Sequence, residues 1–401
     1  MARKRKKKTN KRIKRKLLGL LFFVILLIIA YFAYPYLSKY LPSSSTSSQT
    51  TSASHNHTST STIYSEEDLS FHFMELGNEF AGDCVYIKAG DKDILIDAGS
   101  RKSSAETIIN YVDNYCTDNT LEYVIATHAH QDHIAGFVGE SNKEGIFDHY
   151  ECEVIIDYSF KNTTSKISSD YEAKRNLEIQ NGATHYTAKK CIENNPVFEI
   201  GDGITMTVLD QKYYHEKSDD ENNYSVCLLF SQNGNNFLFT GDLEKEGEES
   251  LASLNELPHV KLFKAGHHGS KTSSNDCLLS EITPEVVVVC CCAGTNEYTE
   301  NINNMFPTQD FINRVAKYTT NVYVTSQLNT YSVNENTIVS NGHKSMNGNI
   351  IVSVNDKNEV VVNCSNNNIK LKDSEWFNTE ITLSSGTRTF RKWPNVESMY
   401  N

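Results

Sequence analysis

Metal-binding residue types are concentrated in one hexapeptide, residues 128–133 (His-Ala-His-Gln-Asp-His). A regular strand would point His133 away from the other three polar side chains, and a regular helix would set His128 and His130 about 200° apart. A turn at the end of a strand can instead bring all four onto two adjacent ions. Residues 123–127 form a short apolar run, so we predict a buried strand that ends at the cluster. The hexapeptide therefore predicts a metal site; the alternative is a polar surface loop.

Three further segments place acids or histidines at predicted strand ends. Residues 95–99 read Leu-Ile-Asp-Ala-Gly, residues 239–242 read Phe-Thr-Gly-Asp, and residues 264–270 read Lys-Ala-Gly-His-His-Gly-Ser. Each segment alone is weak evidence, because an acid after a strand also serves to form a turn. Together with the hexapeptide they occupy four successive strand ends, which indicates a single site.

From about residue 68 to 365 the chain alternates strand-like and helix-like runs. The predicted helices span 104–117, 170–181, 244–255 and 308–317. The main predicted strands span 71–76, 84–88, 93–97, 123–127, 152–157, 204–209, 225–231, 236–240, 260–265, 285–292 and 321–325. Strands that end in polar loops, with helices between them, describe a layered α/β domain. We therefore predict one folded domain over 66–365, and the sequence indicates no role for the tail 366–401.

These motifs resemble those of the metallo-β-lactamase-fold hydrolases: strand-Asp-Ala-Gly, His-x-His-x-Asp-His, Gly-Asp and a late His-Gly. A closer resemblance, to the metallo-hydrolase domain of the competence DNA-uptake protein ComEC and its free-standing relatives, rests on residues 222–225, 239–244 and 267–273. The catalytic domain of pneumococcal phosphorylcholine esterase is a second similar relative. The resemblance covers about 68–360 and implies an αββα sandwich.

The resemblance implies two divalent metal ions and six ligands. The ligands are His128, His130, Asp132, His133, Asp242 and His268. The first two would bind one ion, the next two and His268 would bind the second, and Asp242 would bridge them. Two neighbouring cations can activate water and polarise a phosphoryl or carbonyl oxygen. Imidazole ligands favour zinc, and the two carboxylates leave manganese open.

Asp132 and His267 are the implied catalytic residues. His267 would protonate a leaving group or stabilise charge on the substrate. The neighbouring His268 and His267 can exchange roles, so the sequence leaves open which of them binds metal. Asp97 would orient the ligands without binding metal itself.

The chain departs from the family pattern in two places. Many relatives have a further histidine before the Gly-Asp motif, whereas here Asn223 or Ser225 would line the site. The subgroup often has Tyr-Gly-His-Pro after the last strand-helix step, whereas this chain has Met-Phe-Pro at 305–307. The second departure leaves the substrate open and also predicts a weakly held first ion.

The N-terminus predicts a membrane anchor. Residues 1–16 contain eleven Lys or Arg and no acid, and residues 17–37 are almost wholly apolar. Some 21 residues make roughly 30 Å of helix, enough to cross a bilayer. The basic tail would remain cytoplasmic, with the Ser/Thr-rich stalk 38–65 and the hydrolase domain outside. A cleaved signal peptide is the competing interpretation.

After residue 16 the chain has 27 Lys and Arg against 50 Asp and Glu, a formal charge of −23. Proteins that grip long nucleic acid usually present a basic surface, so this balance disfavours processive DNA handling. We predict a membrane-anchored extracellular hydrolase of the phosphodiesterase or nuclease type, acting on nucleic acid or a cell-envelope polymer. The alternatives are a phosphorylcholine-type envelope esterase and a catalytically weak metal-binding surface domain.

Ten cysteines are spread through apolar runs, including three in succession at 290–292. Neighbouring cysteines in a strand point to opposite faces, so they cannot bind one ion together. We therefore predict buried free thiols rather than a disulfide framework.

Overall fold

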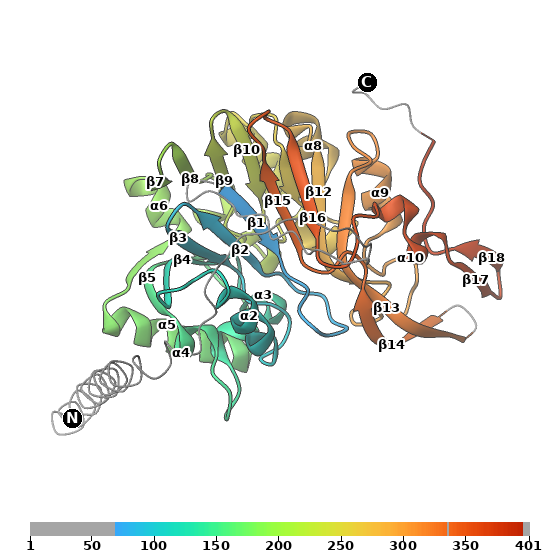
Figure 1. Ribbon diagram of the computed structural model, residues 1–401, viewed down its shortest axis with the longest axis horizontal. Helices are drawn as coiled ribbons and strands as arrows, with labels where there is room; N and C mark the ends of the chain where they lie inside the picture. Colours follow the sequence, from blue (N-terminus) through green and yellow to red (C-terminus); the bar gives the residue numbers. More distant parts are fainter. Residues whose placement is uncertain (1–68, 335–336, 396–401) are drawn as a thin grey trace, which may run out of the picture. The chain divides into compact units, whose positions relative to one another are not determined.

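The computed structural model describes residues 69–334 and 337–395. Two eight-stranded sheets lie face to face with helices on their outer sides (Figure 1). This confirms the predicted two-sheet α/β architecture. The predicted tail 1–16, anchor 17–37 and stalk 38–65 all lie outside the described residues. Within the described part, none of the helices combines the length and apolarity needed to span a bilayer.

The first sheet carries the hexapeptide. Its spatial order is β16 (Val360–Cys364), β15 (Ile350–Val354), β1 (Leu69–Phe73), β2 (Val85–Ala89), β3 (Lys92–Ile96), β4 (Thr120–Ala126), β5 (Glu151–Asp157) and β6 (Thr184–Thr187). Strands β3 to β6 run parallel, and the remaining pairs are antiparallel. The carboxyl ends of β3 and β4 therefore meet at one edge of the sheet.

The second sheet repeats this arrangement. Its spatial order is β14 (Thr337–Ser345), β13 (Val322–Asn334), β12 (Val286–Ala293), β11 (Leu262–Lys264), β10 (Asn235–Phe239), β9 (Leu228–Gln232), β8 (Ile204–Val208) and β7 (Val197–Gly201). Strands β10 to β13 run parallel. The Gly-Asp and His-His motifs thus follow two adjacent parallel strands, β10 and β11.

Helices cover the outer face of each sheet (Figure 1). On the first sheet these are α2 (Ser104–Val112), α3 (Gln131–Val138), α4 (Ile146–His149) and α5 (Lys166–Asn181). On the second they are α7 (Lys245–Leu254), α8 (Asp276–Ile282) and α9 (Gln309–Val315). The shorter elements are α6 (Ala188–Asn194), η2 (Lys212–Tyr214), η3 (Glu221–Tyr224), η4 (Gly266–Gly269), η5 (Leu371–Asp373), α10 (Glu375–Asn378), β17 (Glu380–Leu383) and β18 (Gly386–Thr389).

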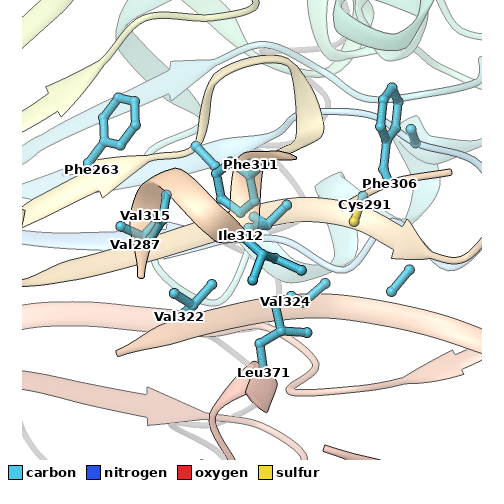
Figure 2. Packing of buried hydrophobic residues seen from close by; sticks show 14 of the residues in the cluster. Phe263, Val287, Cys291, Phe306, Phe311, Ile312, Val315, Val322, Val324 and Leu371 are labelled. Carbon is cyan, nitrogen blue, oxygen red and sulfur yellow. The ribbon is translucent and has the colours of Figure 1, made fainter. Parts of the chain in front are cut away.

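Strand β12 shows how one apolar run builds two cores. Val288 and Cys290 face the core between the sheets, whereas Val287 and Cys291 face the core under α8 and α9. This alternation follows from the two-residue period of a strand. Figure 2 shows Val287 and Cys291 within the outer core. All ten cysteines are free and buried or partly buried, as predicted.

The segment after residue 365, for which the sequence indicates no role, contributes to the outer core of the second sheet. Its buried apolar side chains are Leu371, Trp376, Phe377, Ile381, Leu383 and Phe390. Figure 2 places Leu371 beside Val324 of β13. The segment lies in the same compact unit as the sheets.

Helix α3 approaches the end of β3 closely. The amide of Gly136 donates to the carbonyl of Ala98 over 2.7 Å, and the amide of Ala98 donates to the carbonyl of His133 over 2.7 Å. A Cβ atom at position 136 would lie 2.3 Å from the Ala98 oxygen, so glycine is required there. This contact fixes the first turn of α3, which carries Asp132 and His133, against the loop that carries Asp97.

Candidate metal centre

Every predicted site residue in the four motifs follows the end of a strand. Asp97 follows β3, and the hexapeptide follows β4 and enters α3. Asp242 follows β10, and the two histidines at 267–268 lie in η4, directly after β11. Since β3 and β4 are parallel and β10 and β11 are parallel, each sheet delivers two motifs at one edge. Side chains at such edges converge on ligands in open α/β sheets.

Four of the predicted ligands form one buried group: Asp132, His133, Asp242 and His268. Their ligand atoms all lie within 4.8 Å of one another. Oδ2 of Asp242 lies 3.1 Å from Nε2 of His133 and 3.4 Å from Nε2 of His268. Oδ2 of Asp132 lies 3.3 Å from the same nitrogen of His268. Two imidazoles and two carboxylates are a donor set for a divalent cation.

The outer nitrogens of both imidazoles are held by hydrogen-bond acceptors. Nδ1 of His268 donates to the carbonyl of Cys290 over 2.9 Å, and Nδ1 of His133 lies 2.7 Å from Oδ2 of Asp97. A carbonyl can only accept, so Nδ1 of His268 carries the hydrogen and Nε2 can bind a metal. Asp97, which also accepts from the amide and hydroxyl of Thr127, orients His133 in the same way.

Two atoms of this group have unmet polar capacity. Nε2 of His133 and Oδ1 of Asp242 are buried and meet no hydrogen-bond geometry, although the nitrogen lies 3.1 Å from Oδ2 of Asp242 and the oxygen lies 3.6 Å from Nζ of Lys264. An unsatisfied buried polar atom costs about 1–3 kcal/mol, and a cation between these atoms would remove that cost. The residues present therefore fit a divalent ion.

His128 and His130 lie beside the four-residue group and contact each other. Nε2 of His128 lies 3.0 Å from Nδ1 of His130, and the ring centroid of His128 lies 4.1 Å from that of His133. His128 is fully buried, and burial together with the neighbouring imidazoles lowers its pKa, which leaves it neutral. Neutral imidazole is the form that binds metal. The ring nitrogens of His128 and His130 lie outside the four-residue ligand group.

The two adjacent histidines of η4 have different surroundings. His268 is buried within the ligand group, whereas the His267 side chain is 21% exposed. Nε2 of His267 lies 3.9 Å from Oδ2 of Asp242, and Nδ1 lies 3.5 Å from Oε1 of Glu244. Of the two roles that the sequence left interchangeable, the geometry gives His268 the ligand position and His267 the solvent-facing one.

Ser225 and Asn223, the two residues predicted to line the site, contact different parts of it. Oγ of Ser225 accepts the Asp242 amide over 3.0 Å and lies 3.5 Å from Nδ1 of His128. Asn223 contacts the amide of Glu244 through Oδ1 over 3.3 Å instead. Ser225 therefore supports the ligand loop directly, and Asn223 supports the residue that faces His267.

The site backbone adopts uncommon conformations. Asp97, His267 and His268 have φ angles of 59°, 47° and 54°. Non-glycine residues with positive φ are rare and concentrate at functional sites. Gly241 also has a positive φ of 53°, and a Cβ there would lie 2.8 Å from Oγ of Ser225. The glycine of the Gly-Asp motif is thus needed to bring Asp242 into the group.

A model of the metallo-beta-lactamase superfamily matches residues 77–293, more than half of the chain. The chain belongs to this superfamily. The matched range contains both sheet edges and all the residues of the buried ligand group. The family resemblance inferred from the motifs is therefore confirmed.

Among curated proteins, the chain is 30% identical over 179 residues to ComE operon protein 3 of Bacillus subtilis (strain 168), covering 44% of this chain and 20% of that protein. It is 27% identical over 207 residues to competence protein ComA of Neisseria gonorrhoeae, covering 51% and 25%. The chain thus spans a fifth to a quarter of these relatives. A solved metallo-beta-lactamase fold protein, YhfI from Bacillus subtilis, is 13% identical with a TM-score of 0.39, covering 64% of this chain and 96% of YhfI. The chain is therefore a metallo-beta-lactamase superfamily protein with relatives among competence proteins.

The charged groups of this metallo-beta-lactamase centre shift one another's pKa values. Burial alone raises the pKa of Asp132, but the hydrogen bond from His268 and the charge on His133 outweigh it and hold the pKa well below its usual range. Burial alone lowers the pKa of His268, but the carboxylates of Asp242 and Asp83 outweigh it and raise the pKa to about 10. The carboxylates are therefore ionised and attract positive charge, whether a proton or a metal ion.

A buried ion pair under the ligands was not predicted from the sequence. Nζ of Lys264 pairs with Oδ2 of Asp83 and lies 3.6 Å from Oδ1 of Asp242. Oδ1 of Asp83 lies 3.2 Å from Nδ1 of His268. Asp83 follows a glycine, so the same Gly-Asp signal that identified Asp242 was present here. Lys264 is the first residue of the segment 264–270, which carries the two histidines.

Two aromatic residues from the loop after β12, Tyr298 and Phe306, form an aromatic wall beside the histidines. The hydroxyl of Tyr298 donates to Oδ2 of Asp132 over 2.6 Å. The ring centroid of Phe306 lies 5.7 Å from that of His267 and 5.8 Å from that of His268, and 5.9 Å from that of Tyr298. Phe306 belongs to the Met-Phe-Pro sequence at 305–307, where the subgroup resemblance implies Tyr-Gly-His-Pro. The structure places this departure from the family pattern at the site itself.

Proposed function

We propose that this protein is a metal-dependent phosphoesterase of the phosphodiesterase type, which uses two divalent cations to activate water. The observation that carries the proposal is the buried group of two imidazoles and two carboxylates, with Nε2 of His133 and Oδ1 of Asp242 left without hydrogen bonds. Zinc suits the imidazoles, and manganese suits the carboxylates. We assign the first ion to His128 and His130 and the second to the buried group, with Asp242 between them.

The residues around the ligands would transfer a proton and orient the site. A bound divalent cation supplies Lewis-acid chemistry, since it acidifies water and polarises a phosphoryl oxygen. The side chain of His267 is partly exposed, and its Nε2, 3.9 Å from Oδ2 of Asp242, can protonate a leaving oxygen. Oε1 of Glu244, 3.5 Å from Nδ1 of His267, holds the orientation of the ring. Asp97 keeps Nε2 of His133 directed at Asp242.

Two substrate classes fit the proposed chemistry, nucleic acid and a phosphoester of the cell envelope. The relationship to proteins named for competence supports nucleic acid. The formal charge of −23 after residue 16 supports a smaller phosphoester, such as a choline-bearing polymer of the cell envelope, over long DNA. We favour a phosphodiester in which only a short part of the substrate enters the site.

Metal analysis and a substrate panel test the proposal on the purified full-length chain in detergent. We expect close to two tightly bound ions per chain and turnover of bis-(p-nitrophenyl) phosphate. Activity on linear DNA and on p-nitrophenyl phosphorylcholine discriminates the two substrate classes. His133→Ala is the inactive control, because it removes a nitrogen 3.1 Å from Asp242. Fewer than one bound ion, or equal turnover by this control, would contradict the proposal and favour a binding domain.

We further propose that residues 17–37 anchor the protein in the cell membrane with the hydrolase domain outside. The basic residues 1–16 before the apolar run support this orientation. Protease added to intact cells should then cut the Ser/Thr-rich segment 43–62 and release the domain. Full protection of the domain in intact cells, with cleavage after lysis, would place it inside instead.

A further inference from the structure

Arg391, near the C-terminus, is a buried cation whose hydrogen-bond acceptors are backbone carbonyls. Its side chain donates through Nε to Pro307 over 2.7 Å, through Nη1 to Phe390 over 2.7 Å, and through Nη2 to Ile302 over 2.9 Å and to Met305. Burial lowers the pKa of Arg391 to about 10, which still leaves it charged at neutral pH. Burying a charge is costly, so we ask which structure the hydrogen bonds of this guanidinium hold in place beyond what apolar packing does.

Three of these carbonyls belong to the turn 302–307 that carries Phe306. The same turn is tied to the centre on its other side. The carbonyl of Phe306 accepts the Gly294 amide over 2.8 Å, and the amide of Thr308 donates to the carbonyl of Gly269 over 2.9 Å. Gly269 directly follows His268. Arg391 therefore holds the outer side of a loop whose inner side contacts the metal-centre histidines.

Residues 371–391, which we call the clamping segment, pack into the outer core of the second sheet. The rings of Trp376 and Phe390 stack with centroids 5.2 Å apart, and Cζ of Arg391 lies 5.8 Å from the Trp376 ring centroid. Figure 2 shows Leu371 and Phe306 as members of the same cluster. The clamping segment 371–391 lies wholly beyond residues 77–293, the range that matches the superfamily.

We propose that Arg391 is a positioning residue that holds Phe306 against His267 and His268, so that the aromatic wall limits which substrates reach the metal centre. Phe306 is only 8% exposed, and its ring covers the side of the imidazoles that faces the loop. Without the guanidinium, three buried carbonyls of the turn lose their donors, and the turn relaxes towards water. The inference rests on the proposed phosphoesterase function for its kinetic consequence only.

The test compares Arg391→Lys with wild type in the full-length protein. Lysine keeps the charge but cannot reach four carbonyls in the fixed fork of a guanidinium. We expect unchanged metal content, a KM for bis-(p-nitrophenyl) phosphate raised about tenfold, and a kcat within about threefold of wild type. Hydrogen exchange at residues 294–308 should accelerate. Arg388→Lys is the matched control, because exposed Arg388 contacts the same turn through the Asn303 side chain, over 3.0 Å.

A double-mutant cycle separates positioning from a general loss of stability. If Arg391 acts through Phe306, the KM effects of Arg391→Lys and Phe306→Leu will not add. Additive effects, or an unchanged exchange rate at 294–308, would overturn the proposal. If wild type shows no phosphoesterase turnover, the proposed function fails. Hydrogen exchange and metal content would still test whether Arg391 holds the turn that carries Phe306. Faster exchange with full metal content supports it, and unchanged exchange excludes it.

Discussion

Asp242→Asn should abolish most metal binding and lower turnover of a phosphodiester by on the order of 10³-fold or more. The substitution keeps the shape of the side chain but removes the charge that lies 3.1 Å from Nε2 of His133 and 3.4 Å from Nε2 of His268. Inductively coupled plasma mass spectrometry would measure the metal, and steady-state kinetics the turnover. Asp276→Asn, at an exposed carboxylate of α8, should change neither.

The same substitution should change how metal binding depends on pH. In wild type the carboxylates raise the pKa of His268 to about 10, so the proton on its imidazole competes with metal throughout the neutral range. Metal affinity should therefore rise with pH and fall as the solution is acidified. Asp242→Asn removes the larger of the two carboxylate charges that raise the pKa of His268 and should flatten this dependence. A variant that retains two ions and the wild-type pH dependence would show that Asp242 is not a ligand.

The sequence predicts the strand ends well because each one combines an apolar run with an abrupt change to polar residues. Asp97, the hexapeptide and Asp242 follow β3, β4 and β10 as expected. The helix ends are less well predicted. Helix α5 begins at Lys166, four residues before the predicted start, because Ser165 caps it by accepting the amide of Ser168. The apolar periodicity of α5 is weak and does not mark where the helix starts, although the capping serine is present in the sequence.

The parts of the site that escape sequence reasoning depend on contacts between distant segments. The choice between the two adjacent histidines is made by left-handed backbone at both positions, which turns only His268 into the ligand group. The clamp joins Arg391 to a turn more than 80 residues earlier. Strand β13 extends to Asn334, beyond the predicted 325, because its second half pairs with β14 as a partly exposed ribbon. None of these partners carries a local signal of its own.

Breaking the buried pair of Asp83 and Lys264 should destabilise the protein by about 3–5 kcal/mol for either Lys264→Met or Asp83→Asn. Both side chains are about 3% exposed, so the remaining charge would stay buried without its partner. The double variant should cost less than the sum of the two, because it removes both charges together. Urea unfolding measures these free energies. Lys317→Met breaks an exposed pair with Asp276 and should cost less than about 1 kcal/mol.

The pair also predicts the sign of the pH dependence of stability. Burial alone raises the pKa of Asp83, but Lys264 and the two neighbouring imidazoles outweigh it and lower the pKa below its usual value. A lowered folded-state pKa means that the stabilisation is present above the unfolded-state value and is lost as the pH falls through the folded-state one. Wild type should therefore lose this contribution only below about pH 4, and Asp83→Asn should lack that loss. Equal acid sensitivity of the two proteins, or a single-variant cost like that of Lys317→Met, would mean that the pair does not hold the ligand loops in place.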